Sequence, residues 1–389
     1  MKVVNICMSA PFTEGYTYQD SMLSDYQQRL GHDVTVITGL KTRNDTGKIV
    51  YTSPCEMVLA NGVHLIRLQP KGIGKIAHNI LGVYYEIEEI LERVSPDFIM
   101  VHGLGSHAAS YAVNYKKKHP EVRLIADSHQ DYGITNTHNI VLQILGKYFK
   151  IRWKLWIKSY EKIYAVTSWR KDFAHDQYGI PRGKLDVLVL GIGDECINLC
   201  YDNENRKKIR DKYSIPEDAF LFCSGGKLDD KKQILQMMQA FEGIKSQNVR
   251  YLVFGSVSDE IKSDFEQILH NDDRIIFTGY IPSSETNNYL AASDFGLFAG
   301  NHSVLWEQAV GCGLPCLFKK YSDVDHVSLT GNCVQLTDTS VQNIREVIEK
   351  VLREQDYYGG MKQAAKEAAK SFSYTEIAKK SLEYAEGIV

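Results

Sequence analysis

The sequence lacks the features that identify a membrane-spanning protein, a nucleic-acid-binding protein or a secreted protein. It has no run of about 18 apolar residues, so no segment is expected to span a membrane. Its 45 Lys and Arg residues nearly balance its 48 Asp and Glu residues, and the net charge of -3 gives no overall attraction to nucleic acid. The short apolar run Val3–Cys7 is soon followed by Pro11, which is not the pattern of a secretory signal, and we expect a cytoplasmic protein.

Cysteine is present, but without the spacing that binds a metal ion. None of the eight cysteines forms a Cys-x-x-Cys pair. Cys196 and Cys200 are spaced by four, as are Cys312 and Cys316, and neither pair has His or Cys neighbours that would complete a tetrahedral ligand set. We therefore expect reduced thiols and no bound metal.

The apolar runs predict strands that alternate with helices. An apolar run at 2–8, a helical pattern at 18–30 that stops at Gly31, and a second run at 34–38 have the size of one strand-helix-strand unit. Further strands are expected at 64–68, 98–102, 123–127, 163–168 and 185–190. Continuous apolar strands between helices are typical of doubly wound parallel α/β sheets.

The length of the chain, 389 residues, suits two domains of this kind. The strand pattern restarts at 219–223, and the segment Gly191-Ile-Gly-Asp194 before it is a natural hinge. We therefore expect a first domain at 1–192, a second at 193–372, and a separate C-terminal helix at 373–389.

One carboxylate stands in an apolar helical turn of the second domain. Glu307 lies in the segment Leu305–Pro315, which follows a strand-like run and a polar loop, Gly300 to Ser303, and ends in Gly-x-Gly-x-Pro stop signals. A short helix at the carboxyl end of a strand is where open α/β sheets bind ligands. A carboxylate there suits a ribose, because its two oxygens can accept hydrogen bonds from two neighbouring hydroxyl groups.

A second motif has the composition of a phosphate site. Gly225, Gly226 and Lys227 follow a predicted strand, Lys232 comes about one turn later, and we expect all of them to open a helix that runs to about residue 244. Backbone N–H groups at a helix start, together with ammonium groups, can bind a diphosphate.

These two motifs resemble those of the GT-B glycosyltransferases of family 4. The segment Trp-Glu-Gln-Ala-Val-Gly-Cys-Gly-Leu-Pro at 306–315 is similar to the family's nucleotide-binding signature, and Leu-Gly-His-Asp-Val-Thr-Val at 30–36 is similar to its second strand. The resemblance implies two Rossmann-like domains that face a cleft, with a C-terminal helix that crosses back to the first domain. It also implies transfer of a sugar from a nucleotide sugar with retention of configuration.

The resemblance assigns roles to residues of the donor site. It implies that Glu307 binds the ribose and that Lys227 and Lys232, at the positions of the family's Arg and Lys, stabilise the leaving diphosphate. Tyr280 and Ile281 are expected beside the nucleotide base. The family's first glutamate is replaced here by Ala299.

The loop after Ala299 is the candidate substitute for that glutamate. Asn301, His302 and Ser303 offer polar side chains there. We expect the metal-independent mechanism of the family, in which the leaving phosphate takes the acceptor's proton. No cofactor is expected, and a UDP-sugar is favoured as the donor.

Two residues of the first domain are also candidates. His129 follows a predicted strand within Asp-Ser-His-Gln-Asp, and the resemblance implies that it contacts the donor sugar; a histidine with a structural role is the alternative. Gly15, in the loop after the first strand, either allows a substrate to approach the backbone or serves as a plain turn glycine.

A basic and aromatic segment covers 145–160. It carries five Lys and Arg residues among two Trp, two Tyr and one Phe, and it has no acidic residue. Such a helix can lie on an anionic membrane surface, or it can pack its aromatic side chains inward and leave its lysines in solvent. Nothing else in the sequence favours the third option, binding to single-stranded nucleic acid.

The sequence therefore predicts a hexosyltransferase that uses a nucleotide sugar and a saccharide or lipid-linked acceptor, as in the assembly of surface polysaccharide or glycolipid. A nucleotide-sugar epimerase or a phosphorylase on the same fold is one alternative. A binding subunit without catalysis is another, because Ala299 replaces the family's glutamate.

Overall fold

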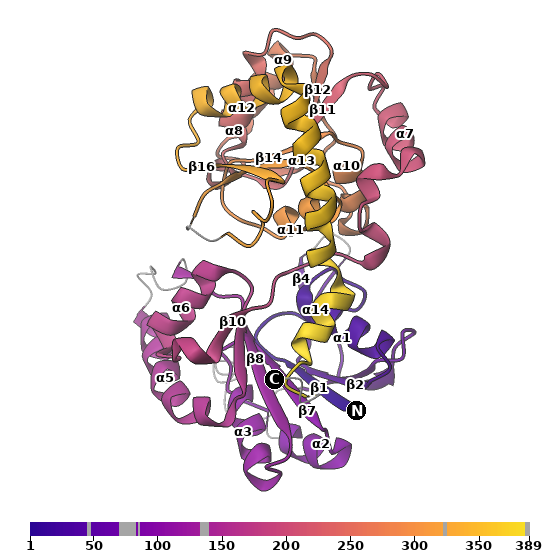
Figure 1. Cartoon of the computed structure of the whole chain (residues 1–389). Coiled ribbons are helices and arrows are strands. Elements are labelled where there is room, and N and C mark those ends of the chain that lie inside the picture. The colour runs from indigo at the N-terminus through magenta and orange to yellow at the C-terminus, as the bar shows by residue number, and fades with distance from the viewer. Residues whose placement is uncertain (45–47, 70–82, 85, 133–139, 322–324, 386–389) are drawn as a thin grey trace. The chain divides into compact units, whose positions relative to one another are not determined.

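The computed structural model describes residues 1–44, 48–69, 83–84, 86–132, 140–321 and 325–385, except for the side chains of 141 and 142. The chain forms two compact units, which we describe separately. Unit 1 comprises Met1–Val189 and Tyr374–Val389, and unit 2 comprises Leu190–Ser373 (Figure 1).

Unit 1 is built on an eight-stranded sheet with the order β10-β9-β8-β7-β1-β2-β6-β5. Every neighbouring pair is parallel except β5 and β6. The strands are β1 (Lys2–Cys7), β2 (Asp33–Thr38), β5 (Cys55–Val58), β6 (His64–Arg67), β7 (Phe98–His102), β8 (Arg123–Ser128), β9 (Lys162–Ala165) and β10 (Leu185–Val187), and β3 (Lys41–Arg43) and β4 (Ile49–Tyr51) form a separate hairpin.

The helices of unit 1 are α1 (Gln19–Arg29), α2 (Glu86–Val94), α3 (Ala108–Lys118), α5 (Ile140–Trp156), α6 (Ser168–Tyr178) and α14 (Tyr374–Ser381). Alternate residues of β1 enter separate cores on the two faces of the sheet: Val4 and Ile6 in one, Val3 and Cys7 in the other. This burial on both faces explains why the residues from Val3 to Cys7 are apolar, with the single exception of Asn5.

The last described helix packs in unit 1, as the sequence predicts. The Gln27 side chain of α1 donates to the Ser381 hydroxyl of α14 over 3.0 Å, and the rings of Tyr26 and Tyr374 lie 5.7 Å apart. The boundary between the two units lies between Val189 and Leu190, slightly before the expected residue 192. Ile192 donates its N–H to Phe372 O at 2.9 Å, a contact within unit 2.

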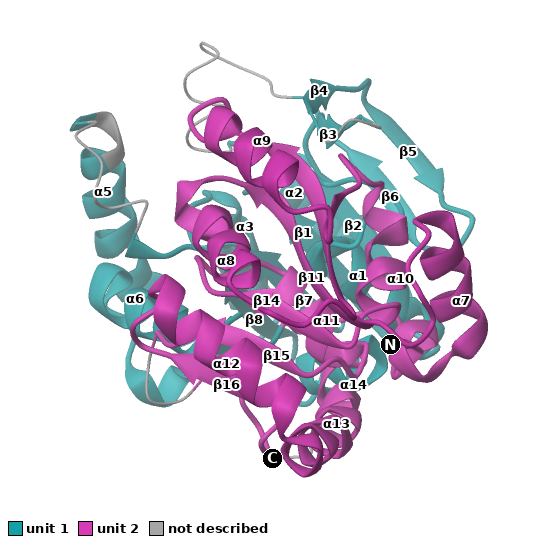
Figure 2. Ribbon diagram, turned by 90° about the horizontal axis from the view of Figure 1, so that it is seen from above, with its two compact units in different colours: residues 1–189, 374–389 teal, residues 190–373 magenta. Residues whose placement is uncertain are grey.

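Unit 2 contains a fully parallel six-stranded sheet with the order β13-β12-β11-β14-β15-β16 (Figure 2). Its strands are β11 (Phe220–Leu228), β12 (Val249–Val257), β13 (Ile275–Phe277), β14 (Phe295–Phe298), β15 (Cys316–Lys319) and β16 (Cys333–Leu336). Its α-helices are α7 (Asn203–Lys212), α8 (Ile234–Glu242), α9 (Lys262–Asn271), α10 (Thr286–Ala291), α11 (Leu305–Gly311), α12 (Val341–Arg353) and α13 (Gln355–Ala368).

One local expectation is wrong: Gly225 and Gly226 do not open a helix. They continue β11, which pairs with β12 as far as Leu228, and a short 3-10 turn, η6 (Asp230–Lys232), separates the strand from α8. A Cβ added at Gly255 would lie 1.8 Å from the carbonyl oxygen of Gly226. The glycines therefore allow two backbones to approach closely inside the sheet.

The basic and aromatic segment packs its aromatic side chains inward. Phe149, Trp153, Trp156 and Tyr160 are buried in the core of unit 1, and the Trp153 indole N–H donates to Leu104 O at 2.9 Å. The sequence allowed the aromatic side chains either to lie on a membrane surface or to pack into the protein, and these four pack into the core. Within the described ranges, no helix combines the length and apolarity needed to cross a bilayer.

Candidate functional site

Glu307 is fully buried on α11 and is held by two histidines. Its Oε1 atom accepts from His302 Nε2 and from His326 Nε2, each at 2.7 Å. Its Oε2 atom is also buried and has no hydrogen-bond partner among the described residues. Burial alone would raise the pKa of Glu307, but the charges and hydrogen bonds of both histidines outweigh it and hold the pKa well below its ordinary value. A charged carboxylate therefore keeps one oxygen for a ligand.

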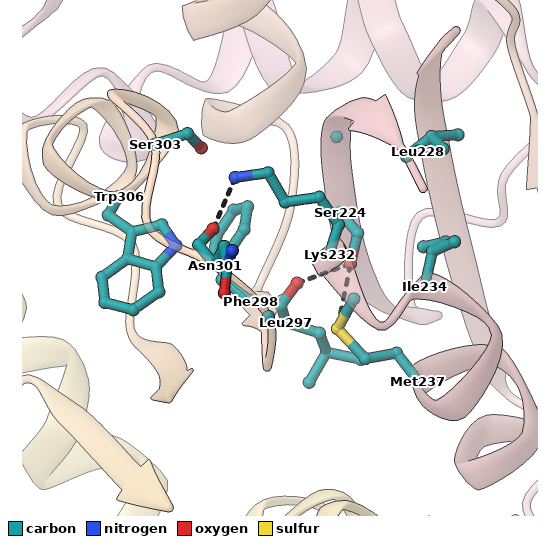
Figure 3. Close-up of a pocket in the computed structure, with 12 residues that line it drawn as sticks. Ser224, Leu228, Lys232, Ile234, Met237, Leu297, Phe298, Asn301, Ser303 and Trp306 are labelled. Carbon is teal, nitrogen blue, oxygen red and sulfur yellow. Dashed lines mark hydrogen bonds between the residues drawn. The ribbon is translucent and has the colours of Figure 1, made fainter. Parts of the chain in front are cut away.

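Lys232 ties the loop that follows β14 to the turn η6. Its Nζ donates to Asn301 O at 2.5 Å and to His302 O at 3.2 Å (Figure 3). The Asn301 N–H in turn donates to Lys231 O at 2.8 Å. A narrow cavity lies beside Lys232 and Asn301, and Ser303 and Trp306 also line it. The structure thus brings Lys232, Asn301, His302, Ser303 and Glu307 together.

Lys227 is placed differently. Its side chain is 74% exposed on β11, and its Nζ lies 3.5 Å from Asp229 Oδ2. Gly225 lines the cavity of Figure 3, whereas Lys227 does not. The ammonium group of Lys227 is therefore free to reorient in solvent, while that of Lys232 is fixed by two carbonyl groups.

Tyr280, Ile281 and Ala299 lie outside the group of residues around Glu307 and Lys232. Tyr280 is 55% exposed and Ile281 is buried, on the segment after β13, and neither lines the cavity of Figure 3. Ala299 is fully buried, and its N–H lies 3.3 Å from Met237 Sδ. A glutamate side chain at 299 would enter the core of unit 2 rather than solvent.

A cavity of about 390 Å³ lies in unit 1 where the strand order reverses, between β1 and β7. Open α/β sheets bind ligands at such positions, outside the carboxyl ends of the strands. His129 lines this cavity, together with His102, Asp20 and Arg43. Gly15 does not line it: its φ of +68° and the open space around it fit a turn.

Asp127 holds the two histidines of this cavity. His102 Nδ1 lies 2.6 Å from Asp127 Oδ2, and His129 Nε2 lies 3.5 Å from it. Burial would raise the pKa of Asp127, but both histidines hold it far below its ordinary range. Burial would lower the pKa of His102, yet the charge and hydrogen bond of Asp127 raise it overall. His102 Nε2 has no hydrogen-bond partner within the described part of the chain, so it can meet a ligand hydroxyl.

The sequence predictions missed His326 and His102. His326 is 19 residues beyond Glu307, and no local spacing connects the two. His102 carries a weak signal, because it ends a buried strand, and residues that end parallel strands meet at one edge of the sheet.

Comparison with known proteins matches both units to one class of enzyme. Residues 21–195 match the family model "Glycosyltransferase Family 4", and residues 205–370 match "Glycosyl transferases group 1". The serotype-specific mannosyltransferase WbdA of Escherichia coli is 19% identical over 305 residues, which cover 75% of this chain and 37% of WbdA. This chain therefore spans little more than a third of that relative.

Solved structures share the fold over the full length. A glycosyltransferase from Rickettsia africae ESF-5 has a TM-score of 0.72 at 15% identity, with 100% of this chain and 98% of that chain covered. Anabaena HepE, solved with UDP and glucose, has a TM-score of 0.69 at 12% identity, with both chains fully covered. With a family model matched in each half, the chain belongs to the family-4 type of GT-B glycosyltransferases.

Proposed function

We propose that the protein transfers a hexose, with retention of configuration, from a nucleoside diphosphate sugar to a hydroxyl group of a saccharide or lipid-linked acceptor. A UDP-sugar is the favoured donor, in keeping with the UDP found in the HepE complex. The observation that carries the proposal is the buried, unpartnered Oε2 of an ionised Glu307. An oxygen of this kind costs free energy until a donor meets it, and a ribose hydroxyl supplies that donor.

The two lysines have separate tasks in this proposal. In the reaction the bond between the anomeric carbon and the β-phosphate oxygen breaks, and the acceptor oxygen bonds to that carbon from the same face. The acceptor's proton passes to the leaving phosphate. Lys227 and Lys232 offset the negative charge that develops there, so neither a metal ion nor a cofactor is required for this step. Asn301, His302 and Ser303 lie beside Lys232 and are the candidate contacts of the donor sugar.

Two histidines of unit 1 also have roles in the proposal. His129 would orient the donor sugar, and His102, fixed by Asp127, would accept a hydrogen bond from a substrate hydroxyl when its ring is neutral. Tyr280 and Ile281 are proposed to lie beside the base.

The test is ligand binding by UDP, GDP, ADP and dTDP in the presence of a chelator, with uridine as the reference without phosphates. We expect Lys227→Ala and Lys232→Ala each to weaken binding of the preferred diphosphate by roughly 10- to 100-fold, because a hydrogen bond to a charged group contributes about 1.5–3 kcal/mol. Binding of the nucleoside should change far less. Lys231→Ala, an exposed lysine of the same turn, is the matched control.

Equal losses for diphosphate and nucleoside would contradict the phosphate assignment. Slow hydrolysis of the nucleotide sugar without acceptor would support an active transferase, whereas its absence, combined with tight donor binding, would point to a binding subunit. Conversion of the donor to its epimer would instead favour the epimerase alternative.

We also propose that α5 is the contact with an anionic membrane that carries a lipid-linked acceptor. The aromatic face of this helix is buried, but the opposite face exposes Ile140, Ile144, Ile151 and Leu155. Their spacing of four, seven and four residues places them on one side of the helix. Figure 2 shows α5 at the edge of unit 1.

Lysines surround this apolar stripe. Lys147, Lys150, Lys154 and Lys158 are all exposed, and there is no acidic residue between 140 and 160. Each cation near an anionic surface contributes about 1 kcal/mol, and the aliphatic side chains add burial in the lipid. An amphipathic helix with aliphatic and basic groups side by side suits such a surface better than it suits bulk water.

The double variant Ile144→Glu/Ile151→Glu should lower binding to phosphatidylglycerol-containing vesicles by at least about 100-fold, since it removes about 1.5–3 kcal/mol of apolar burial for each of the two residues. Co-sedimentation with vesicles measures this effect. Ile49→Glu, on the exposed β4, is the control and should bind normally. Equal binding to neutral and anionic vesicles, or an unaffected double variant, would refute the membrane contact.

A further inference from the structure

Three potential metal ligands converge beside the loop that follows β14. His302, His326 and Glu307 each offer one ligand atom, a ring nitrogen or a carboxylate oxygen, and these three atoms all lie within 4.8 Å of one another. The side chains of both histidines are 5% exposed, and that of Glu307 is 0% exposed. The three residues come from different parts of unit 2: the loop before α11, α11 itself, and the segment between β15 and β16.

We infer that these residues form a binding site for one divalent transition-metal ion of the zinc class. Two imidazoles and one carboxylate are a ligand set that zinc prefers, and a fourth position is left for water or a ligand. Magnesium and calcium prefer oxygen ligands, so they fit this set poorly. The inference goes beyond the proposed transferase activity and does not depend on it.

The geometry is close to that of a metal centre. In a tetrahedral site with bonds of about 2.0–2.1 Å, ligand atoms lie about 3.3 Å apart. The two Nε2 atoms lie 2.7 Å from Glu307 Oε1, so each would have to retreat by only about 0.6 Å, a small side-chain movement, to admit the ion. Aromatic rings pack beside the cluster: Trp306 stacks on Phe318 at 4.6 Å, and the His302 ring meets Trp306 edge to face at 5.2 Å.

The geometry also leaves a place for a nucleotide. Both histidines contact Oε1 of Glu307, so an ion held by the three residues would bond on the Oε1 side and leave Oε2 for a ribose hydroxyl. Metal and nucleotide can therefore bind together.

Metal binding requires a change of tautomer. Each Nε2 must present a lone pair to the ion, so the hydrogen that it donates to Glu307 is lost to solvent and a hydrogen is taken up at Nδ1 of the same neutral ring. No net proton is released by a neutral histidine in this exchange.

The experiment is to strip the full-length protein with a chelator and titrate it with Co²⁺, Zn²⁺ and Mg²⁺. We expect one Co²⁺ ion per chain, with visible d–d bands and without the near-ultraviolet charge-transfer band of a cysteine thiolate. Zn²⁺ at about a hundred times its dissociation constant should raise the unfolding midpoint by roughly 5–10 °C, and Mg²⁺ should not. His326→Gln and His302→Gln should each weaken Co²⁺ binding at least tenfold, while His270→Gln, an exposed histidine of α9, should not.

Three results would overturn the inference: no stoichiometric Co²⁺ binding by the wild type, a thiolate band in the cobalt spectrum, or equal affinities of the wild type and His326→Gln. UDP binding is measured on the same samples with and without chelator. Metal binding without UDP binding would leave this site standing and remove the proposed donor site. UDP binding without metal binding would do the reverse.

Discussion

Glu307→Gln is expected to lower kcat/KM for the nucleotide sugar by roughly 100-fold, a loss of about 2.7 kcal/mol of transition-state stabilisation. The substitution conserves volume, so the reason is electrostatic. Both His302 and His326 donate to one side of the carboxylate. The amide oxygen of glutamine must take that side, and its NH₂ group then replaces Oε2, turning an acceptor of ribose hydroxyls into a donor.

Because this residue is proposed to act on the ribose, binding of UDP and of uridine should weaken by similar factors. Calorimetric titration of both ligands, with a chelator present to exclude metal effects, measures the two factors alongside the steady-state kinetics. Glu285→Gln, an exposed glutamate of the same unit, serves as the control. Normal uridine affinity in Glu307→Gln would show that the ribose binds elsewhere.

The sequence predicts the sheets well because the physical signal is local. β1 is buried on both faces, so apolar residues occupy Val3–Cys7 except at Asn5, and α1 is followed by Gly31, which has a φ of +89° that favours glycine. The local sequence does not predict that β11 continues through Gly225 and Gly226. Ser-Gly-Gly-Lys is typical of a turn, and only pairing with β12 keeps it extended.

The structure brings together some of the residues that the sequence proposes for the site. Glu307 and Lys232 stand in recognisable motifs, and the structure places them on either side of one loop. His326 joins them only because β15 pairs with β14 and carries the following segment back to α11. His102 likewise meets Asp127 through the register of β7 and β8, which pairs these two residues directly. Contacts that depend on strand pairing across many residues leave no mark in local sequence.

Gly300→Ala is expected to lower the unfolding midpoint of the protein by roughly 5–10 °C, as about 2–3 kcal/mol of strain would do in domains of this size. A Cβ at this position would lie 2.2 Å from the Lys232 carbonyl carbon and 2.3 Å from its Cα and oxygen. These are backbone atoms, so no side chain can rotate away, and the loop after β14 must move. The φ of Gly300 is not positive, which leaves steric overlap as the cause.

Gly360→Ala on α13 separates this effect from the general behaviour of alanine. A Cβ there meets nothing within 4 Å, and alanine in a helix is favoured over glycine, so this control should gain about 0.5–1 kcal/mol. Calorimetric melting of both variants should therefore give shifts of opposite sign. A Gly300→Ala protein that melts like the wild type would mean that the loop does not rest on Lys232.

The functional consequence of Gly300→Ala follows from what the loop carries. Movement of Gly300 takes Asn301 and His302 with it, which breaks the two hydrogen bonds of Lys232 and removes one of the two donors to Glu307. Affinity for UDP and for Co²⁺ should therefore fall together in this variant. Vesicle binding should persist, because α5 belongs to unit 1 and shares no residue with the loop. If nucleotide affinity survived while the midpoint fell, the loop would support the fold of unit 2 without forming part of the donor site.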